Sequence, residues 1–291
     1  MANLSISKAW DDSRPIIGRD GRLMFIIALA TVVVPQTLLY VMAPEQTQLG
    51  MNPGVAIEGE DPSLLQSFLT LVASLLNIVG SIAISYLALT RGTSVADGLR
   101  RGLKRLLPTI VAFFLLIIVV AVLAVVVALM FVGVSPAELS DPNAMPEFSA
   151  VGAIAVILAI AFFLWIGVRF MLMTPVIAAE DVGPIAIFKR SWQLTKGHFW
   201  RLLGFLLLFA IGALIFMAAV SLVGGLVIAL ILGDPEAYSL SALFTGLLGG
   251  LAGAALTVVY SVIAARIYLQ LADLPADPDV ATLRGGADGP A

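Results

Sequence analysis

Five hydrogen-bonding side chains recur along one long apolar run, at Thr70, Ser74, Asn77, Ser81 and Ser85. They are spaced by three or four residues, so an α-helix would align them in one stripe. Within a membrane this stripe must face protein or water, because lipid tails offer no hydrogen bonds. The first interpretation is a seam where helices pack closely. The alternative is the wall of a polar path, with Asn77 near the middle of the span.

A second group of residues, between 174 and 201, combines positive charge with aromatic rings. At helical spacing, one face would hold Ile185, Phe188, Trp192 and Phe199, and the other Lys189, Arg190, Gln193 and Lys196. This is the layout of a cationic amphipathic helix that lies on an anionic membrane surface. The sequence therefore predicts a surface helix between two apolar segments.

Two arginines, Arg169 and Arg266, lie inside apolar runs, close to ends that adjoin basic loops. The simpler expectation is that each side chain extends to the headgroup level. The alternatives are an ion pair between Arg169 and Glu180 or Asp181, or a bond from either arginine to a lipid phosphate. The candidate contacts for lipid headgroups are Arg169, Lys189, Arg190, Trp192, Lys196 and Arg266.

Residues for catalysis are scarce. The chain has no cysteine and a single histidine, His198, which is expected at the headgroup level beside Phe199 and Trp200. We find no nucleophile elbow, no Walker A motif and no histidine pair at metal-ligand spacing. We therefore predict no catalytic residue, no cofactor and no metal, and do not expect an enzyme. Only an acid–base pair assembled by the fold would change this expectation.

The elements that carry these residues are long and apolar. Of 291 residues, 60% are hydrophobic and 12% charged, whereas soluble domains are about 45–50% apolar and about 25% charged. A span needs about 20 apolar helical residues. Six segments are long enough, and we place them at 22–42, 64–90, 108–134, 149–174, 202–232 and 240–272. The sequence predicts an all-α integral membrane protein, a six-transmembrane-helix bundle in one domain over 1–272, with a disordered cytoplasmic tail at 273–291.

Charge is distributed unevenly between the loops. The segments 43–63, 135–148 and 233–239 contain nine acidic residues and no Lys or Arg, and all 16 basic residues lie elsewhere. The positive-inside rule then places both termini in the cytoplasm. The basic residues adjoin the spans, so the topology accounts for them and nucleic-acid binding is not expected.

The spans carry local signals of packing and repetition. Pro35 is expected to kink the first span, and the pairs Gly246/Gly250 and Gly249/Gly253 of the sixth are expected to pack within the chain. A basic amphipathic segment precedes each odd-numbered span. Similar five-residue sequences lie at the ends of the even-numbered spans: SYLAL at 85–89, RFMLM at 169–173 and RIYLQ at 266–270. This pattern is consistent with three repeated units, each an amphipathic surface helix plus a helical hairpin. Chance similarity among membrane hairpins is the alternative.

The run from Pro175 to Trp200 supports a family resemblance. It contains Pro175, Glu180, Ser191-Trp192, Leu194-Thr195-Lys196 and Phe199-Trp200, directly before a span. It resembles the membrane domain fused to some bacterial glycerophosphoryl diester phosphodiesterases and its six-span relatives, including the YciC-like group. The resemblance implies a helical bundle in the bacterial cytoplasmic (inner) membrane. The phosphodiesterase chemistry would reside in a soluble barrel that this sequence does not contain, so that activity is not carried over.

Two functions are consistent with these features. The first is a non-catalytic accessory or lipid-organising role, in which basic cytoplasmic helices engage anionic headgroups, with or without a membrane or soluble protein partner. The alternative is a transporter or channel for a small or lipid-like solute. Its route would be lined by the polar stripe of the second span and by the kinked first span.

Overall fold

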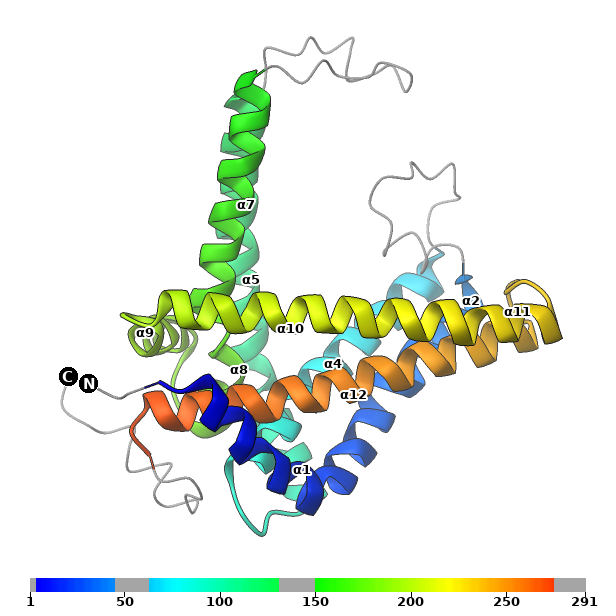
Figure 1. Ribbon diagram of the computed structural model, residues 1–291, viewed down its shortest axis with the longest axis horizontal. Coiled ribbons are helices and arrows are strands. Elements are labelled where there is room, and N and C mark those ends of the chain that lie inside the picture. The colour runs from blue at the N-terminus through cyan, green and yellow to red at the C-terminus, as the bar shows by residue number, and fades with distance from the viewer. Residues whose placement is uncertain (1–3, 45–62, 131–149, 275–291) are drawn as a thin grey trace.

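The computed structural model describes residues 4–44, 63–130 and 150–274, and these are almost entirely helical (Figure 1). The principal elements in chain order are α1 (Ile6–Ala28), the π-helical η1 (Leu29–Val33), α2 (Val34–Met42), α4 (Leu64–Leu89), α5 (Val95–Met130), α7 (Ala150–Phe170), α8 (Met173–Ala179), α9 (Pro184–Thr195), α10 (Phe199–Val220), the π-helical η2 (Ser221–Gly225), α11 (Leu226–Leu232) and α12 (Leu240–Leu271).

Within the described residues, six helical segments are long and apolar enough to cross a membrane. They are Ile6–Met42, Leu64–Leu89, Val95–Val122, Ile157–Ala179, Phe199–Leu232 and Leu240–Leu271. The all-α, six-span prediction is thus confirmed by length and composition. The predicted tail lies almost wholly outside the described residues.

The boundaries of the first and third spans differ from the prediction. Both helices begin earlier, at Ile6 and Val95, because the basic amphipathic segment before each span is continuous with it. Ser94 and Asp97 have the three-residue spacing of a capping box, and they cap the start of α5: the Asp97 amide donates to Ser94 Oγ at 3.2 Å, and the Ser94 amide donates to Asp97 Oδ2 at 3.0 Å. This reciprocal pair satisfies backbone groups that a helix start leaves without partners.

The first span is distorted where the sequence predicts it. The π-helical η1 ends at Val33, two residues before Pro35. Proline lacks an N–H, and its ring collides with the carbonyl one turn earlier, so the hydrogen-bond ladder cannot continue unchanged. A wider turn is one of the known ways in which a helix accommodates this interruption.

Helix α12 lies at the centre of the molecule and contacts α1, α2, α4 and α10 (Figure 1). Its glycines allow the close approach: a Cβ on Gly246 would lie 3.0 Å from Tyr40 Cβ, and one on Gly250 would lie 3.2 Å from Val33 Cα. The Gly246/Gly250 pair therefore packs within the chain, as expected. A Cβ on Gly249 would have no other atom within 4 Å, so the pair Gly249/Gly253 does not form a comparably close contact between helices.

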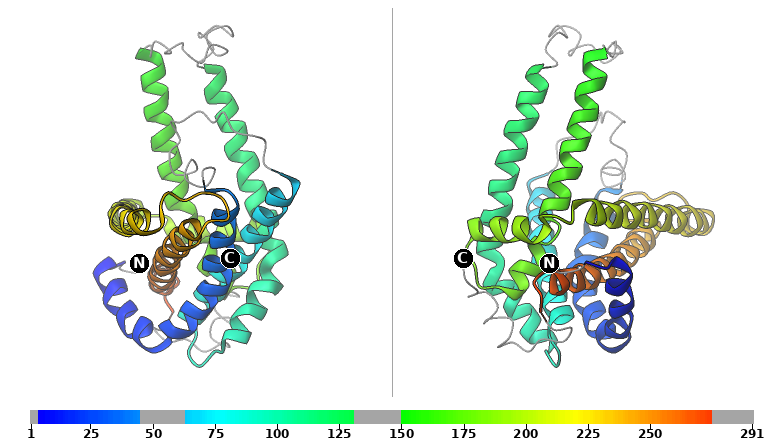
Figure 2. Two further views of the ribbon diagram at one scale, coloured as in Figure 1. Left: turned by 90° about the vertical axis from the view of Figure 1, so that its right-hand side faces the viewer. Right: turned by 60° about the vertical axis from the view of Figure 1, so that its left-hand side comes forward.

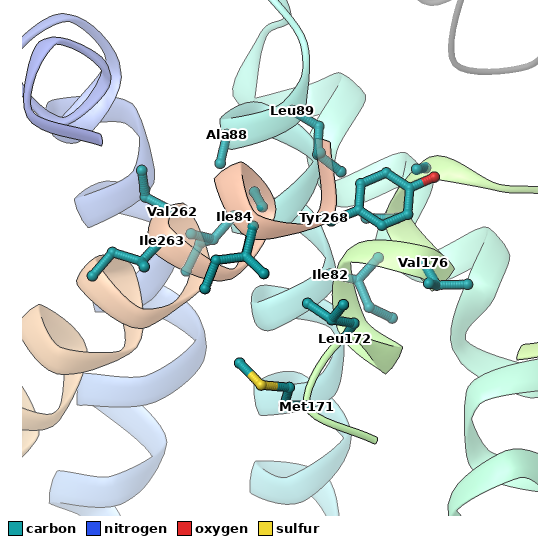
Figure 3. Packing of buried hydrophobic residues seen from close by; sticks show 14 of the residues in the cluster. Ile82, Ile84, Ala88, Leu89, Met171, Leu172, Val176, Val262, Ile263 and Tyr268 are labelled. Atoms are coloured by element: carbon teal, nitrogen blue, oxygen red, sulfur yellow. The ribbon is translucent and has the colours of Figure 1, made fainter. Parts of the chain in front are cut away.

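The buried core is concentrated toward one end of the bundle. Ile82 and Ile84 of α4 meet Leu172, just before α8, and Tyr268 of α12 (Figure 3). Away from this end, α5 and α7 project from the other spans (Figure 2), and no residue in the most apolar window of Phe199–Leu232 is buried. In a bilayer such apolar faces meet lipid tails that are as apolar as they are, so nothing drives them inward.

Candidate functional site

Helix α9 forms where the sequence predicts a surface helix, but it is docked on the protein. Its buried residues are Ile187, Ser191, Leu194 and Thr195. Ser191 Oγ donates to the Arg169 carbonyl at 2.8 Å. Two residues of the predicted apolar face pack edge-on against aromatic rings of α7. The ring centroids of Phe188 and Phe170 are 5.2 Å apart, and those of Trp192 and Trp165 are 5.0 Å apart. Ile185 is 76% exposed, so the most buried face is rotated from the one predicted.

Two arginines of α5 hold the end of α8. The last carbonyls of a helix have no partner inside it, and here Arg101 Nε donates to Ala178 O at 2.9 Å and its Nη2 to Ala179 O at 3.2 Å. Arg105 donates to the carbonyls of Ile177 and Glu180. Both guanidiniums are buried, and a cation at a helix C-terminus is also favoured by the helix dipole.

The two carboxylates after α8 are both paired. Glu180 is buried, and its Oε1 accepts from Arg190 Nε and from the Tyr268 hydroxyl, each at 2.8 Å. Asp181 Oδ1 accepts from Arg101 Nη1 at 2.7 Å. Burial acts to raise the pKa of Asp181, but the guanidiniums of Arg101 and Arg105 outweigh it and lower the pKa below its usual value. Asp181 therefore stays ionised at neutral pH.

The alternative considered for Arg169, an ion pair with Glu180 or Asp181, is not formed, since other arginines bind both carboxylates. Arg169 instead lies over the rings of Trp192 and Trp165, at 4.8 and 5.8 Å from their centroids. Its Nε and Nη1 are buried without a hydrogen-bond partner in the described part of the chain. The indole faces supply a cation–π attraction in place of an anion.

Arg266 is buried within the protein. It is 4% exposed, and its Nη2 donates to the carbonyl of Ala88 near the end of α4. Like Arg101, it binds a carbonyl at a helix C-terminus. This placement favours a structural role for Arg266 over contact with lipid.

Sequence reasoning missed the inward direction of Arg101 and Arg105. At helical spacing, the apolar residues of this segment are Val95, Leu99, Leu103 and Leu106, yet Leu103 is 63% exposed. The buried face holds Gly98, Arg101, Gly102 and Arg105 instead. Glycines alternating with arginines at helical spacing were the available signal, because a glycine face lets another helix approach closely.

A cationic pocket of about 370 Å³ lies between the end of α9 and the start of α10. It is lined by Arg190, Gln193, Leu194, Lys196, Gly197, His198 and Leu271. Gly197 has φ +87°, a conformation that favours glycine, and it turns the chain so that Lys196 and His198 both reach the pocket. No acidic side chain is among these lining residues. Lys189 is exposed and lies outside the pocket.

A polar cavity of about 360 Å³ lies among α4, α8, α10 and α12. The stripe residues Asn77, Ser81 and Ser85 line it, opposite Thr257 and Ser261 of α12. Its remaining lining residues are Thr174, Pro175, Phe209, Ala213, Leu256, Tyr260 and Ala264. The structure thus brings part of the predicted stripe together with hydroxyls of the sixth span.

The other two stripe residues lie outside this cavity. Thr70 Oγ1 donates to the Gln66 carbonyl and Ser74 Oγ to the Thr70 carbonyl, each at 2.8 Å. Both are exposed and are satisfied within their own helix. Over the described ranges, no group of three or more His, Asp or Glu side chains is placed to hold a metal ion.

The chain matches a known protein family. Residues 4–271 match the family DUF7847, described as a domain of unknown function. Neither the curated proteins nor the solved structures contain a match to the chain.

Proposed function

The chain belongs to the DUF7847 family, and we propose that it is a non-catalytic, multi-pass protein of the bacterial cytoplasmic membrane with an accessory, lipid-organising role. Its six apolar helices give it the character of a membrane protein. The bacterial membrane is inferred from the resemblance to the membrane domains of glycerophosphoryl diester phosphodiesterases. The orientation, with both termini in the cytoplasm, is inferred from the loop charges.

The cationic pocket is the observation that supports this proposal. Lys196 brings positive charge to it, Arg190 lines it while its Nε bonds to Glu180, and His198 precedes the first turn of the 22-residue helix α10. Backbone N–H groups at a helix N-terminus and the positive end of its dipole attract anions. An anionic group such as a lipid phosphate fits this combination.

The position of the pocket favours a lipid over a soluble anion. Trp200, in the first turn of α10, is 80% exposed, and Phe199 packs edge-on against it with centroids 5.4 Å apart. Exposed aromatic rings at the start of a span lie at the membrane–water interface. The adjacent pocket would then lie at the depth of the phosphates.

Lys196→Gln tests the proposal. We expect it to weaken binding of phosphatidylglycerol about fivefold, because one basic residue near an anionic surface contributes about 1 kcal/mol. Binding would be measured by titrating the full-length protein in neutral detergent with phosphatidylglycerol and counting retained lipid by native mass spectrometry. Arg190 is left intact, because its loss would also leave Glu180 buried without its cation.

Lys189→Gln is the matched control, with the same charge change on an exposed lysine of α9 outside the pocket. Equal weakening by both variants would indicate diffuse surface attraction and contradict a pocket. Binding of inorganic phosphate as strong as that of the lipid would assign the pocket to a soluble anion. Retention of a stoichiometric second polypeptide in place of lipid would make a protein partner the target of the accessory role.

The alternative is a transporter or channel, and the polar cavity is the observation that favours it. In the described conformation the stripe does not form an open route, because Ser85 at its inner end is 1% exposed. This geometry favours a binding site over a channel. A transporter would need a second conformation in which the Ser85 end opens.

A further inference from the structure

The polar cavity among α4, α8, α10 and α12 points to a second ligand site, separate from the cationic pocket. We propose that it binds the polar part of an uncharged amphiphile that carries hydroxyl and ester groups, of the acylglycerol class. The proposal does not depend on the cationic pocket, whose residues are entirely different.

The first argument is an unsatisfied hydroxyl. Ser85 is buried, lines the cavity, and its Oγ has no hydrogen-bond partner within the described residues. A buried hydroxyl without a partner is costly, and native proteins usually supply one. If Ser85 served only a packing seam, alanine would fill the position without that cost. A ligand oxygen in the cavity would satisfy it.

The second argument concerns charge. The cavity wall presents an amide on Asn77 and hydroxyls such as those of Ser81, Thr257 and Ser261, and no Lys, Arg, Asp, Glu or His is among its lining residues. A charged ligand there would lack a counter-charge in surroundings of low dielectric constant. Hydroxyl and ester groups need only the hydrogen bonds that these side chains exchange.

The third argument is access from the bilayer. Exposure falls along the stripe from Asn77, which is exposed, through half-buried Ser81 to buried Ser85, so the mouth lies at Asn77 and the closed end at Ser85. Leu71 and Leu76 of α4 and Leu208 of α10 are exposed apolar residues on two of the helices that form the cavity wall. A lipid can enter from the hydrocarbon region through such a mouth, whereas a polyol without a tail would first have to leave water.

The fourth argument is size. The volume of about 360 Å³ is near the lower end of the roughly 300–1,000 Å³ typical of small-molecule sites. It holds a glycerol-ester part, and the acyl chains would lie outside along α10. Phe209, Ala213 and Leu256 form the apolar part of the wall where the chains would begin.

Ser85→Ala provides the sharpest test, because it removes one hydroxyl and nothing that the fold uses. Binding of radiolabelled dioctanoylglycerol to the full-length protein in nanodiscs of neutral lipid would be measured together with thermal stability. We expect saturable 1:1 binding, a dissociation constant raised about fivefold by Ser85→Ala, and unchanged or higher stability of the unliganded protein. Asn77→Leu, at the mouth, should weaken binding at least about tenfold, because it removes the amide and adds bulk.

Ser74→Ala is the matched control, since it lies on the same stripe outside the cavity, and it should leave binding unchanged. The proposal is overturned if dioctanoylglycerol does not bind saturably, if Ser85→Ala and Asn77→Leu both bind like the unmodified protein, or if Ser74→Ala weakens binding equally. Equal affinity for glycerol alone would also overturn it, because the ligand would then not be an amphiphile. None of these measurements involves an anionic lipid, so this proposal and the cationic pocket fail independently.

Discussion

Arg101 and Arg105 count as loop charges in the positive-inside rule, yet their guanidiniums are buried against the end of α8. Each supplies donors to carbonyls that α8 leaves without partners. The planar guanidinium has several donors in a fixed arrangement, which suits it to binding adjacent carbonyls. At this scale, residue type alone does not separate a cation that meets lipid from one that caps a helix.

Arg101→Lys should therefore destabilise the protein despite conserving charge. A single ammonium cannot replace the bonds to Ala178 O, Ala179 O and Asp181 Oδ1, and a buried acceptor left without a partner costs about 1–3 kcal/mol. The free energy of unfolding in mixed detergent micelles would show the loss. Arg100→Lys, on the exposed face of the same helix, is the control. Equal stability of the two variants would show that the capping bonds contribute little.

At the scale of elements, the packing of α5 on α4 depends on two glycines. A Cβ on Gly98 would lie 2.5 Å from Leu87 Cδ1, and one on Gly102 would lie 2.5 Å from the Val79 carbonyl oxygen. A side-chain methyl can move aside, but a backbone carbonyl within a helix cannot. This close approach places Arg101 and Arg105 within reach of α8.

Gly102→Ala should separate α5 from α4 and lower the free energy of unfolding by about 1–3 kcal/mol, as overpacking does in other cores. The same micelle unfolding measurement applies. Gly212→Ala in α10 is the control, because a Cβ there meets nothing within 4 Å and alanine is the better helix former by about 1 kcal/mol. A Gly102→Ala protein as stable as the control would mean that the two helices are not closely packed.

At the scale of the whole molecule, the basic segments lie next to the most tightly packed part of the protein. The buried core of Figure 3 adjoins the basic segments around 91–105 and 189–201. The acidic segment 233–239 joins α11 to the start of α12, at the opposite end of that helix from the core residue Tyr268. If the basic end is cytoplasmic, the tightly packed half of the bundle lies toward the cytoplasm.

This orientation can be measured directly, because the chain has no cysteine. In intact spheroplasts, Glu236→Cys should react with a membrane-impermeant maleimide, and Lys189→Cys should react only after permeabilisation. Both positions are exposed, so each variant controls for reactivity of the other. The reversed labelling pattern would place the basic helices outside the cytoplasm and remove the basis for cytoplasmic lipid binding.

The sequence by itself determined the six apolar helices, the polar stripe on α4 and the capping of α5. These features depend on length, composition and short-range spacing, since a span needs only enough apolar residues and a cap involves neighbours three residues apart. The distortion before Pro35 is equally local, because it follows from a missing N–H.

Only the tertiary structure decided which partner each polar group found. Glu180 meets Arg190 and Tyr268, which lie 10 and 88 residues away in the chain, and Ser85 shares a cavity with Ser261 of the sixth span. In a bilayer, lipid and protein neighbours are equally apolar, so hydrophobic periodicity does not say which face of a span is buried. Close approach at glycines and hydrogen bonding between helices settle that choice, and both depend on contacts between distant parts of the chain.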